Sequence, residues 1–138
     1  MNKIYSYSFP AKLEELPNAL NPVLQALEEV EVDHRTAYQV RLALDEILSN
    51  IVEYAYNGGE GEVKIRYELT DAPSRIVINI IDEGVAFNPL EVEDPNLSKE
   101  LDERDIGGLG LFIVKNIMDE MTYRRDGNRN VLIIKKNI

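Results

Sequence analysis

A glutamate and an asparagine, four residues apart in a helical pattern, are the first candidates for chemistry. Glu46 and Asn50 lie one turn apart, so both side chains project from the same side of the expected helix. A carboxylate and an amide in this arrangement suit a hydrated Mg²⁺, which prefers oxygen ligands. The carboxylate could also accept a proton from an attacking oxygen. A solvated helix face, shared with Glu53 and Asn57, is the alternative explanation.

A second candidate is the carboxylate that ends an apolar strand. Asp82 is followed closely by Gly84, and Phe87 closes the same short segment. A carboxylate at a strand end can accept a hydrogen bond from an exocyclic amine, and a glycine lets the backbone approach a ligand. A tight turn after a strand would explain the same residue types.

A third candidate is a run of glycines before an apolar helix. Gly107, Gly108 and Gly110 would let backbone N–H groups and the helix N-terminus face phosphate oxygens. The run is not a P-loop, because no Gly-Lys-Ser/Thr follows it. It is not a dinucleotide fingerprint either, because a long polar segment precedes it. A flexible linker into a helix is the alternative.

The elements that carry these residues predict an α+β fold. Strands are expected at residues 4–9, 63–69, 75–81, 122–125 and 131–136, and helices at about 11–29, 33–56 and 107–121. Pro17 and Pro22 are expected to break or reset the first helix. Short connections between strands favour a mixed, mostly antiparallel sheet with the helices on one face. Residues 1–138 would then form one domain, a two-layer α/β sandwich.

The helix that would carry Glu46 has the clearest pattern in the sequence. Asp33 is placed to cap its start, and Asn57-Gly58-Gly59 would end it. Apolar residues recur along one stripe that would face the core: Val40, Leu44, Ile47, Leu48, Ile51 and Ala55. Glu46 and Asn50 lie about 120° from the centre of this stripe.

Composition narrows the classes of partner. The 138 residues carry a formal net charge of -10, which argues against direct nucleic-acid binding, because such proteins present Lys and Arg to phosphates. A polyanionic ligand would therefore be held by backbone amides, a helix N-terminus or a metal ion. No stretch approaches the roughly 18 apolar residues of a membrane span. Residues 1–10 lack the pattern of a secretory signal, and the absence of cysteine fits a reducing cytoplasm.

Taken in order, the three candidates resemble the nucleotide-binding boxes of a known superfamily. Glu46-x-x-x-Asn50, Asp82-x-Gly84-x-x-Phe87 and Gly108-x-Gly110 are similar to the N, G1 and G2 boxes of the gyrase, Hsp90 and histidine-kinase ATPases. Within that superfamily, the chain looks most like the bacterial anti-sigma factor serine kinases, which phosphorylate STAS-domain anti-anti-sigma proteins. The resemblance covers nearly the whole chain.

The resemblance implies Mg-ATP as the ligand and assigns a role to each candidate. Asn50 would ligate Mg²⁺, Glu46 would act as general base or orient the nucleophile, and Asp82 would bind the adenine amino group. Gly84 would allow close approach, and Phe87 would pack by the base. The residues implied to hold the cofactor are Asn50, Asp82, Gly84, Phe87, Gly108 and Gly110, the last two by contacting the phosphates.

Two residues depart from the family pattern. Tyr54 stands where many relatives have His, and Asn130 lies in the last hairpin, where relatives usually place a Thr near the adenine site. The polar, acidic segment Asn88–Ile106 is expected to be a mobile lid over the nucleotide.

The implied function is an ATP-dependent protein serine kinase that acts as an anti-sigma factor or partner-switching regulator. Its implied partners are a STAS-domain protein, a sigma factor and a second copy of the chain, because relatives commonly form dimers. The alternative is a non-catalytic ATP-binding module whose nucleotide state sets partner affinity, and retention of Glu46 favours catalysis. A histidine-kinase catalytic domain fits less well, because the sequence contains no helical dimerisation domain with a phosphoacceptor His.

Overall fold

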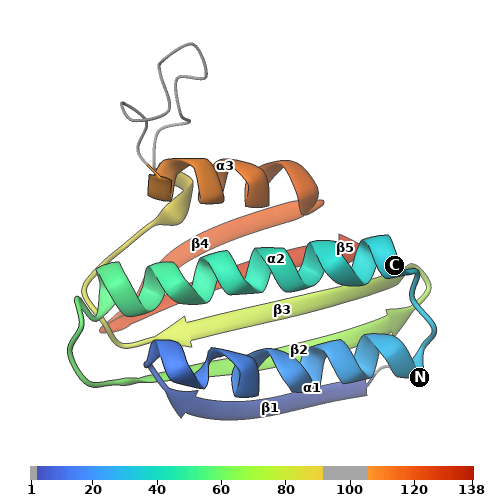
Figure 1. Ribbon diagram of the computed structural model, residues 1–138, viewed down its shortest axis with the longest axis horizontal. Coiled ribbons are helices and arrows are strands. Elements are labelled where there is room, and N and C mark those ends of the chain that lie inside the picture. The colour runs from blue at the N-terminus through green and yellow to red at the C-terminus, as the bar shows by residue number, and fades with distance from the viewer. Residues whose placement is uncertain (1–2, 92–105) are drawn as a thin grey trace.

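A β-sheet forms one layer of the molecule, and helices that all lie on one of its faces form the other (Figure 1). The computed structural model describes residues 3–91 and 106–138. The strands are β1 (Lys3–Pro10), β2 (Glu62–Asp71), β3 (Ser74–Asp82), β4 (Glu120–Asp126) and β5 (Arg129–Asn137). The α-helices are α1 (Leu16–Glu29), α2 (His34–Asn50) and α3 (Ile106–Ile117). This is the predicted order of elements and the predicted two-layer α+β architecture.

The sheet has the strand order β1-β2-β3-β5-β4, and each neighbouring pair is antiparallel. Its central strand is β3, as the nearly continuous apolar run at 75–81 predicted. The predicted alternation in β2 is confirmed as well. The polar side chains of this strand are exposed or half-buried, and the apolar side chains between them are buried: Val63, Ile65, Tyr67 and Leu69. One face of the sheet therefore builds the core with the helices.

Helix α1 continues through both of the prolines that were expected to interrupt it. Pro17 lies in the first turn, where the N–H groups have no partner within the helix, so a missing N–H costs nothing there. Pro22 lies inside the helix. The apolar face of α1 is buried on both sides of Pro22, through Leu20 and Val23, and this burial offsets the lost hydrogen bond.

Helix α2 has the start and the core-facing stripe that the sequence predicted. The side chain of Asp33 caps the helix, because its Oδ1 accepts a hydrogen bond from the Thr36 N–H at 2.7 Å. Every residue of the predicted stripe is buried. Beyond Asn50 the chain makes a π-helical turn, Ile51–Ala55, and the left-handed backbone of Asn57 and Gly58 then ends the helical run.

The glycine run opens the third helix, as the predicted range 107–121 implied, and its glycines belong to the helix itself and not to a loop before it. Helix α3 begins at Ile106, so Gly107 and Gly108 occupy its first turn and Gly110 its fifth position. Of the predicted lid, the residues Pro89–Glu91 form one 3₁₀ turn, and residues 92–105 lie outside the described part of the chain. No helix within 3–91 or 106–138 has the length and apolar character needed to span a membrane.

Candidate functional site

Three polar side chains are buried among the described residues, and they converge on one place. Asn50 is 6% exposed, and Asp82 and Asn130 are each 3% exposed. All three line the same small cavity, whose other walls are mostly apolar: Ile47, Ile51, Phe87, Pro89, Leu111, Tyr123 and Leu132. Burial of polar groups costs free energy, so their concentration in one apolar cavity marks the candidate site.

Of the predicted pair on α2, Asn50 lines this cavity, whereas the Glu46 side chain lies one turn away against Gly110 of α3. The Nδ2 of Asn50 donates a hydrogen bond to the Glu46 carbonyl at 2.6 Å, which leaves Oδ1 as the atom that can ligate a metal ion. The Glu46 carboxylate is half-buried beside α3. Burial, and secondarily the neighbouring Asp45 carboxylate, raise the pKa of Glu46 above its ordinary value.

Gly110 lacks a side chain at the point where α3 meets Glu46. A Cβ built on Gly110 would overlap the Glu46 carboxylate, with the Glu46 Cδ only 2.8 Å away. Its own N–H falls at the fifth helical position, whereas the first four N–H groups of a helix are the ones without intrahelical acceptors. The contact of Gly108 with phosphate stays a prediction that this helix start allows, and Gly110 has a separate steric reason to be glycine.

Asp82 is held in the cavity by donors from two directions. Its Oδ1 accepts hydrogen bonds from the Gly84 N–H at 2.9 Å and from the Asn130 Nδ2 at 2.8 Å. Burial raises the pKa of Asp82, and these two hydrogen bonds and the Arg125 charge oppose that rise. Both described bonds fall on Oδ1, so Oδ2 is the oxygen that can accept a ligand donor.

Gly84 brings the loop after Asp82 against the end of the α2 helical run. The Val85 N–H donates to the Ala55 carbonyl at 2.8 Å, and a Cβ on Gly84 would overlap that carbonyl, with its carbon 2.6 Å away. Only glycine allows this approach. The loop that carries Asp82 and the helix that carries Asn50 are therefore packed directly against each other.

Phe87 closes the cavity by stacking on Tyr54, the residue that departs from the family pattern. Their ring centroids lie 5.4 Å apart with an interplanar angle of 27°. The cavity itself measures only about 10 Å³. A purine is much larger than this volume, so it could bind only if the cavity widened.

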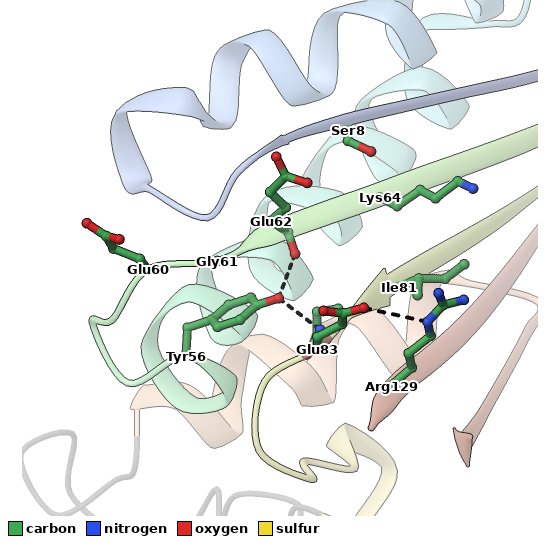
Figure 2. A pocket seen from close by; sticks show the side chains of 10 residues that line it. Ser8, Tyr56, Glu60, Gly61, Glu62, Lys64, Ile81, Glu83 and Arg129 are labelled. Carbon is green, nitrogen blue, oxygen red and sulfur yellow. Dashed lines mark hydrogen bonds and ion pairs between the residues drawn. The ribbon is translucent and has the colours of Figure 1, made fainter. Parts of the chain in front are cut away.

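Tyr56 is a residue of this region that the sequence analysis missed. Figure 2 shows its hydroxyl between two backbone segments: it accepts from the Glu83 N–H at 2.8 Å and donates to the Glu62 carbonyl at 2.6 Å. It thus ties the end of the helical run to the residue after Asp82. In the sequence, the one feature that could have pointed to Tyr56 is its position two residues after Tyr54 and just before the glycines that end the helix.

The larger cavity drawn in Figure 2 lies on the face of the sheet that the helices leave uncovered. It measures about 480 Å³ and is lined by charges of both signs, including Lys64, Glu62 and Arg129. The Arg129 Nε lies 3.8 Å from the Glu83 carboxylate, and both side chains are more than half exposed. Among the described residues, Asp82 is the one that lines both this cavity and the small buried one; Asn50 and Asn130 line only the buried cavity.

The donor set at the buried cavity fits a magnesium nucleotide. An amide oxygen on Asn50 can serve as one hard oxygen ligand, and Mg²⁺ takes its other ligands from phosphates and water. Among the described residues that line the cavity, Asp82 is the charged one, and its buried carboxylate is an acceptor that suits an exocyclic amine. The half-buried Glu46 carboxylate, with its raised pKa, is suited to accept a proton.

Comparison with known proteins identifies the family of the chain. A model of the histidine kinase-like ATPase domain family matches residues 9–136. The serine/threonine-protein kinase BtrW of Bordetella bronchiseptica is 33% identical over 94 residues, which cover 67% of this chain and 66% of that protein. The serine-protein kinase RsbW of Bacillus mycoides is 30% identical over 100 residues, 70% of this chain and 61% of that protein. The matched region thus spans less than two thirds of each relative.

A solved structure has the same fold. The crystal structure of the RsbU and RsbW domains of Rv1364c from Mycobacterium tuberculosis matches 98% of this chain and 32% of its own, with a TM-score of 0.67 and 14% sequence identity. The family match covers the whole region from the end of β1 to β5, including every residue of the buried cavity. The chain therefore belongs to the histidine kinase-like ATPase domain family.

Proposed function

We propose that the protein is an ATP-dependent protein serine kinase that acts as a partner-switching regulator, phosphorylating a STAS-domain anti-anti-sigma protein and binding a sigma factor. The single observation that carries the proposal is the half-buried Glu46 carboxylate one turn from the buried Asn50. A domain that only binds nucleotide needs the oxygen of Asn50 but no base beside it. The names of the relatives, which are protein kinases acting on serine or threonine, support the same reading.

Each buried group has a role in this proposal. The Asp82 Oδ2 would accept a hydrogen bond from the adenine amino group, and the Asn50 Oδ1 would ligate the metal ion of Mg-ATP. Phe87, already stacked on Tyr54, would pack against the base. The N–H groups of the first turn of α3, at Gly107 and Gly108, would face the phosphates, where the helix dipole favours negative charge.

The proposed reaction is transfer of the γ-phosphoryl group to a serine hydroxyl. The hydroxyl oxygen forms a bond to the γ-phosphorus as the bond to the bridging oxygen breaks, and ADP leaves with that electron pair. The Glu46 carboxylate accepts the hydroxyl proton, and its raised pKa brings it closer to the pH at which it must do so. Bound Mg²⁺ would neutralise charge on the phosphates.

A second candidate function is a non-catalytic module whose nucleotide state sets its affinity for a partner. The observation that favours it is the closed cavity of about 10 Å³, because nucleotide entry must displace neighbouring elements. Such a displacement changes the surface that a partner would meet. The kinase proposal includes this coupling, so the two candidates differ only in whether phosphate is transferred.

The test compares variants of Glu46 and Asn50 in two assays, Mg-ATP affinity and phosphate incorporation into a STAS-domain substrate. Glu46→Gln should keep Mg-ATP binding while transfer falls by roughly 10²–10⁴-fold, the usual range for a general base. Asn50→Ala should weaken metal-dependent binding itself. Glu53→Gln, an exposed glutamate in the same helical run, is the matched control and should change neither.

The outcomes separate the two candidates. Wild-type protein that binds the STAS partner only with nucleotide, yet transfers no phosphate, would establish the non-catalytic module. Transfer by Glu46→Gln at the wild-type rate would leave the kinase in place but remove Glu46 as its base. Because Glu46 and Asn50 lie on one helix, general damage to that helix would affect both variants alike, and a difference between them reports their roles.

A further inference from the structure

Asn130 is the most heavily hydrogen-bonded side chain in the described part of the chain. It lies directly opposite Asp82 in the pairing of β3 with β5, and it is 3% exposed. Its Nδ2 donates to the Asp82 Oδ1 and to the Val85 carbonyl, each at 2.8 Å. Its Oδ1 accepts from the Phe87 N–H at 3.2 Å and from the Tyr123 hydroxyl.

The partners fix the orientation of this amide. A flip would place the Asn130 oxygen against two other acceptors, the Asp82 carboxylate and the Val85 carbonyl. It would also place the NH₂ group against donors, among them the Phe87 N–H. An amide nitrogen has two protons, and both are bonded within the protein. Asn130 therefore has no donor left for a base in the cavity, although it lines that cavity.

The same amide holds the loop that follows Asp82 at two separate points. Its nitrogen bonds the Val85 carbonyl and its oxygen the Phe87 N–H, so the loop is bound on both sides of Ala86. Arg125 adds a bond to the Asn130 Oδ1 at 3.2 Å and one to the Gly84 carbonyl at 2.8 Å. Asn130 thus contributes both to the orientation of the Asp82 carboxylate and to the path of the loop that follows it.

We propose that Asn130 is a positioning residue that determines specificity for the 6-amino group of the purine. By occupying Asp82 Oδ1, it leaves Oδ2 as the acceptor turned toward the ligand, and by holding the loop, it fixes the distance at which a base can lie. This inference rests on the proposed binding of ATP. It assigns to Asn130 no direct contact with the base.

The decisive measurement is discrimination between two ligands and not affinity alone. Mg-ATP and Mg-purine riboside triphosphate, which lacks the 6-amino group, are titrated calorimetrically into each variant. Wild-type protein should bind ATP about 10–100-fold more tightly, the range expected for one hydrogen bond to a charged acceptor. In Asn130→Asp, which keeps the shape but replaces both donors by an acceptor, the ratio should fall below about threefold.

Two further variants keep the test informative. Asn128→Asp makes the same amide-to-carboxylate change at an exposed position of the same hairpin, and its ratio should equal that of wild type. Tyr123→Phe removes one donor to the Asn130 Oδ1 while the amide stays, so its ratio should lie between those of wild type and Asn130→Asp. It serves in place of Asn130→Asp if that variant does not fold.

A purely structural role for Asn130 would weaken both ligands equally. An unchanged ratio in Asn130→Asp, or in Tyr123→Phe where Asn130→Asp does not fold, would therefore overturn this inference and leave the proposed function standing. Equal binding of both ligands by wild-type protein would overturn it together with the role of Asp82. Wild-type protein that binds neither ligand would overturn the proposed function itself.

Discussion

Replacement of Gly110 by alanine should move the Glu46 carboxylate without changing Glu46 itself. The new Cβ would overlap the carboxylate and lie 2.8 Å from the Glu46 Cδ, whereas carbon atoms in contact lie about 3.5–4.0 Å apart. The obstructing atoms are the far end of a flexible side chain, so the side chain yields and the helices keep their places. The carboxylate should therefore shift by about 1 Å.

Gly110→Ala should slow phosphate transfer but leave the unfolding free energy nearly unchanged. Alanine in a helix interior is favoured over glycine by about 0.5–1 kcal/mol, and an off-rotamer Glu46 costs about 0.5–1.5 kcal/mol, so the unfolding free energy should change by less than about 1 kcal/mol. Misplacement of a reacting group by 1 Å can slow a reaction about 10²-fold. That corresponds to a barrier about 2.7 kcal/mol higher.

The assay is a double-mutant cycle on phosphate transfer to the STAS substrate. Gly110→Ala should lower kcat about 100-fold while Mg-ATP affinity stays within about threefold of wild type. In a Glu46→Ala background, where the obstructed side chain is absent, the same change should cost nothing further. An equal loss in both backgrounds would refute the reasoning, because Gly110 would then act through something other than Glu46.

Two more changes test the Asp82 loop. Asp82→Asn should weaken ATP binding at least about tenfold in calorimetry, since a neutral amide oxygen is a poorer acceptor. Burial raises the pKa of Asp82 in the folded protein, so the folded state loses stability as the pH rises through that pKa. Urea melts should therefore show Asp82→Asn to be more stable than wild type at pH 7, and the difference in unfolding free energy between the two should disappear in acid. Tyr56→Phe removes the hydroxyl that bonds the Glu83 N–H and the Glu62 carbonyl and should lower the unfolding free energy by about 1–3 kcal/mol. Unchanged urea midpoints would contradict either prediction.

The layers of the fold could be predicted because each element carries a single, strong periodicity. The alternation at Val63–Leu69 and the stripe from Val40 to Ala55 both face a core, and the structure buries both. The extent of helix α1 was harder to predict, because the rule that proline breaks a helix considers only the local sequence. Pro22 lacks an N–H, but the burial of residues on both sides of it comes from helices and strands that local sequence does not reveal.

Within the site, the sequence identified residues along one element better than contacts between elements. Glu46 and Asn50 share a helix, so their spacing in the sequence is enough to place them together. The contact of Glu46 with Gly110 depends on how α3 packs on α2, which no spacing encodes. The bond between Asp82 and Asn130 depends on strand register, and a shift of one residue would turn Asn130 to the other face.

The small size of the cavity and the burial of its three polar side chains both affect the free energy of ligand binding. With the loop and α3 closed, the Asp82 carboxylate is bonded by the protein alone, and its raised pKa reports that this environment disfavours the charge. A ligand with an amino group would supply another donor, but a base could enter only if a cavity of about 10 Å³ widened. Part of the binding free energy must therefore be used to open the site. If the protein binds ATP as proposed, nucleotide binding would be coupled to the outer surface of these elements, which is the coupling that the proposed partner-switching role requires.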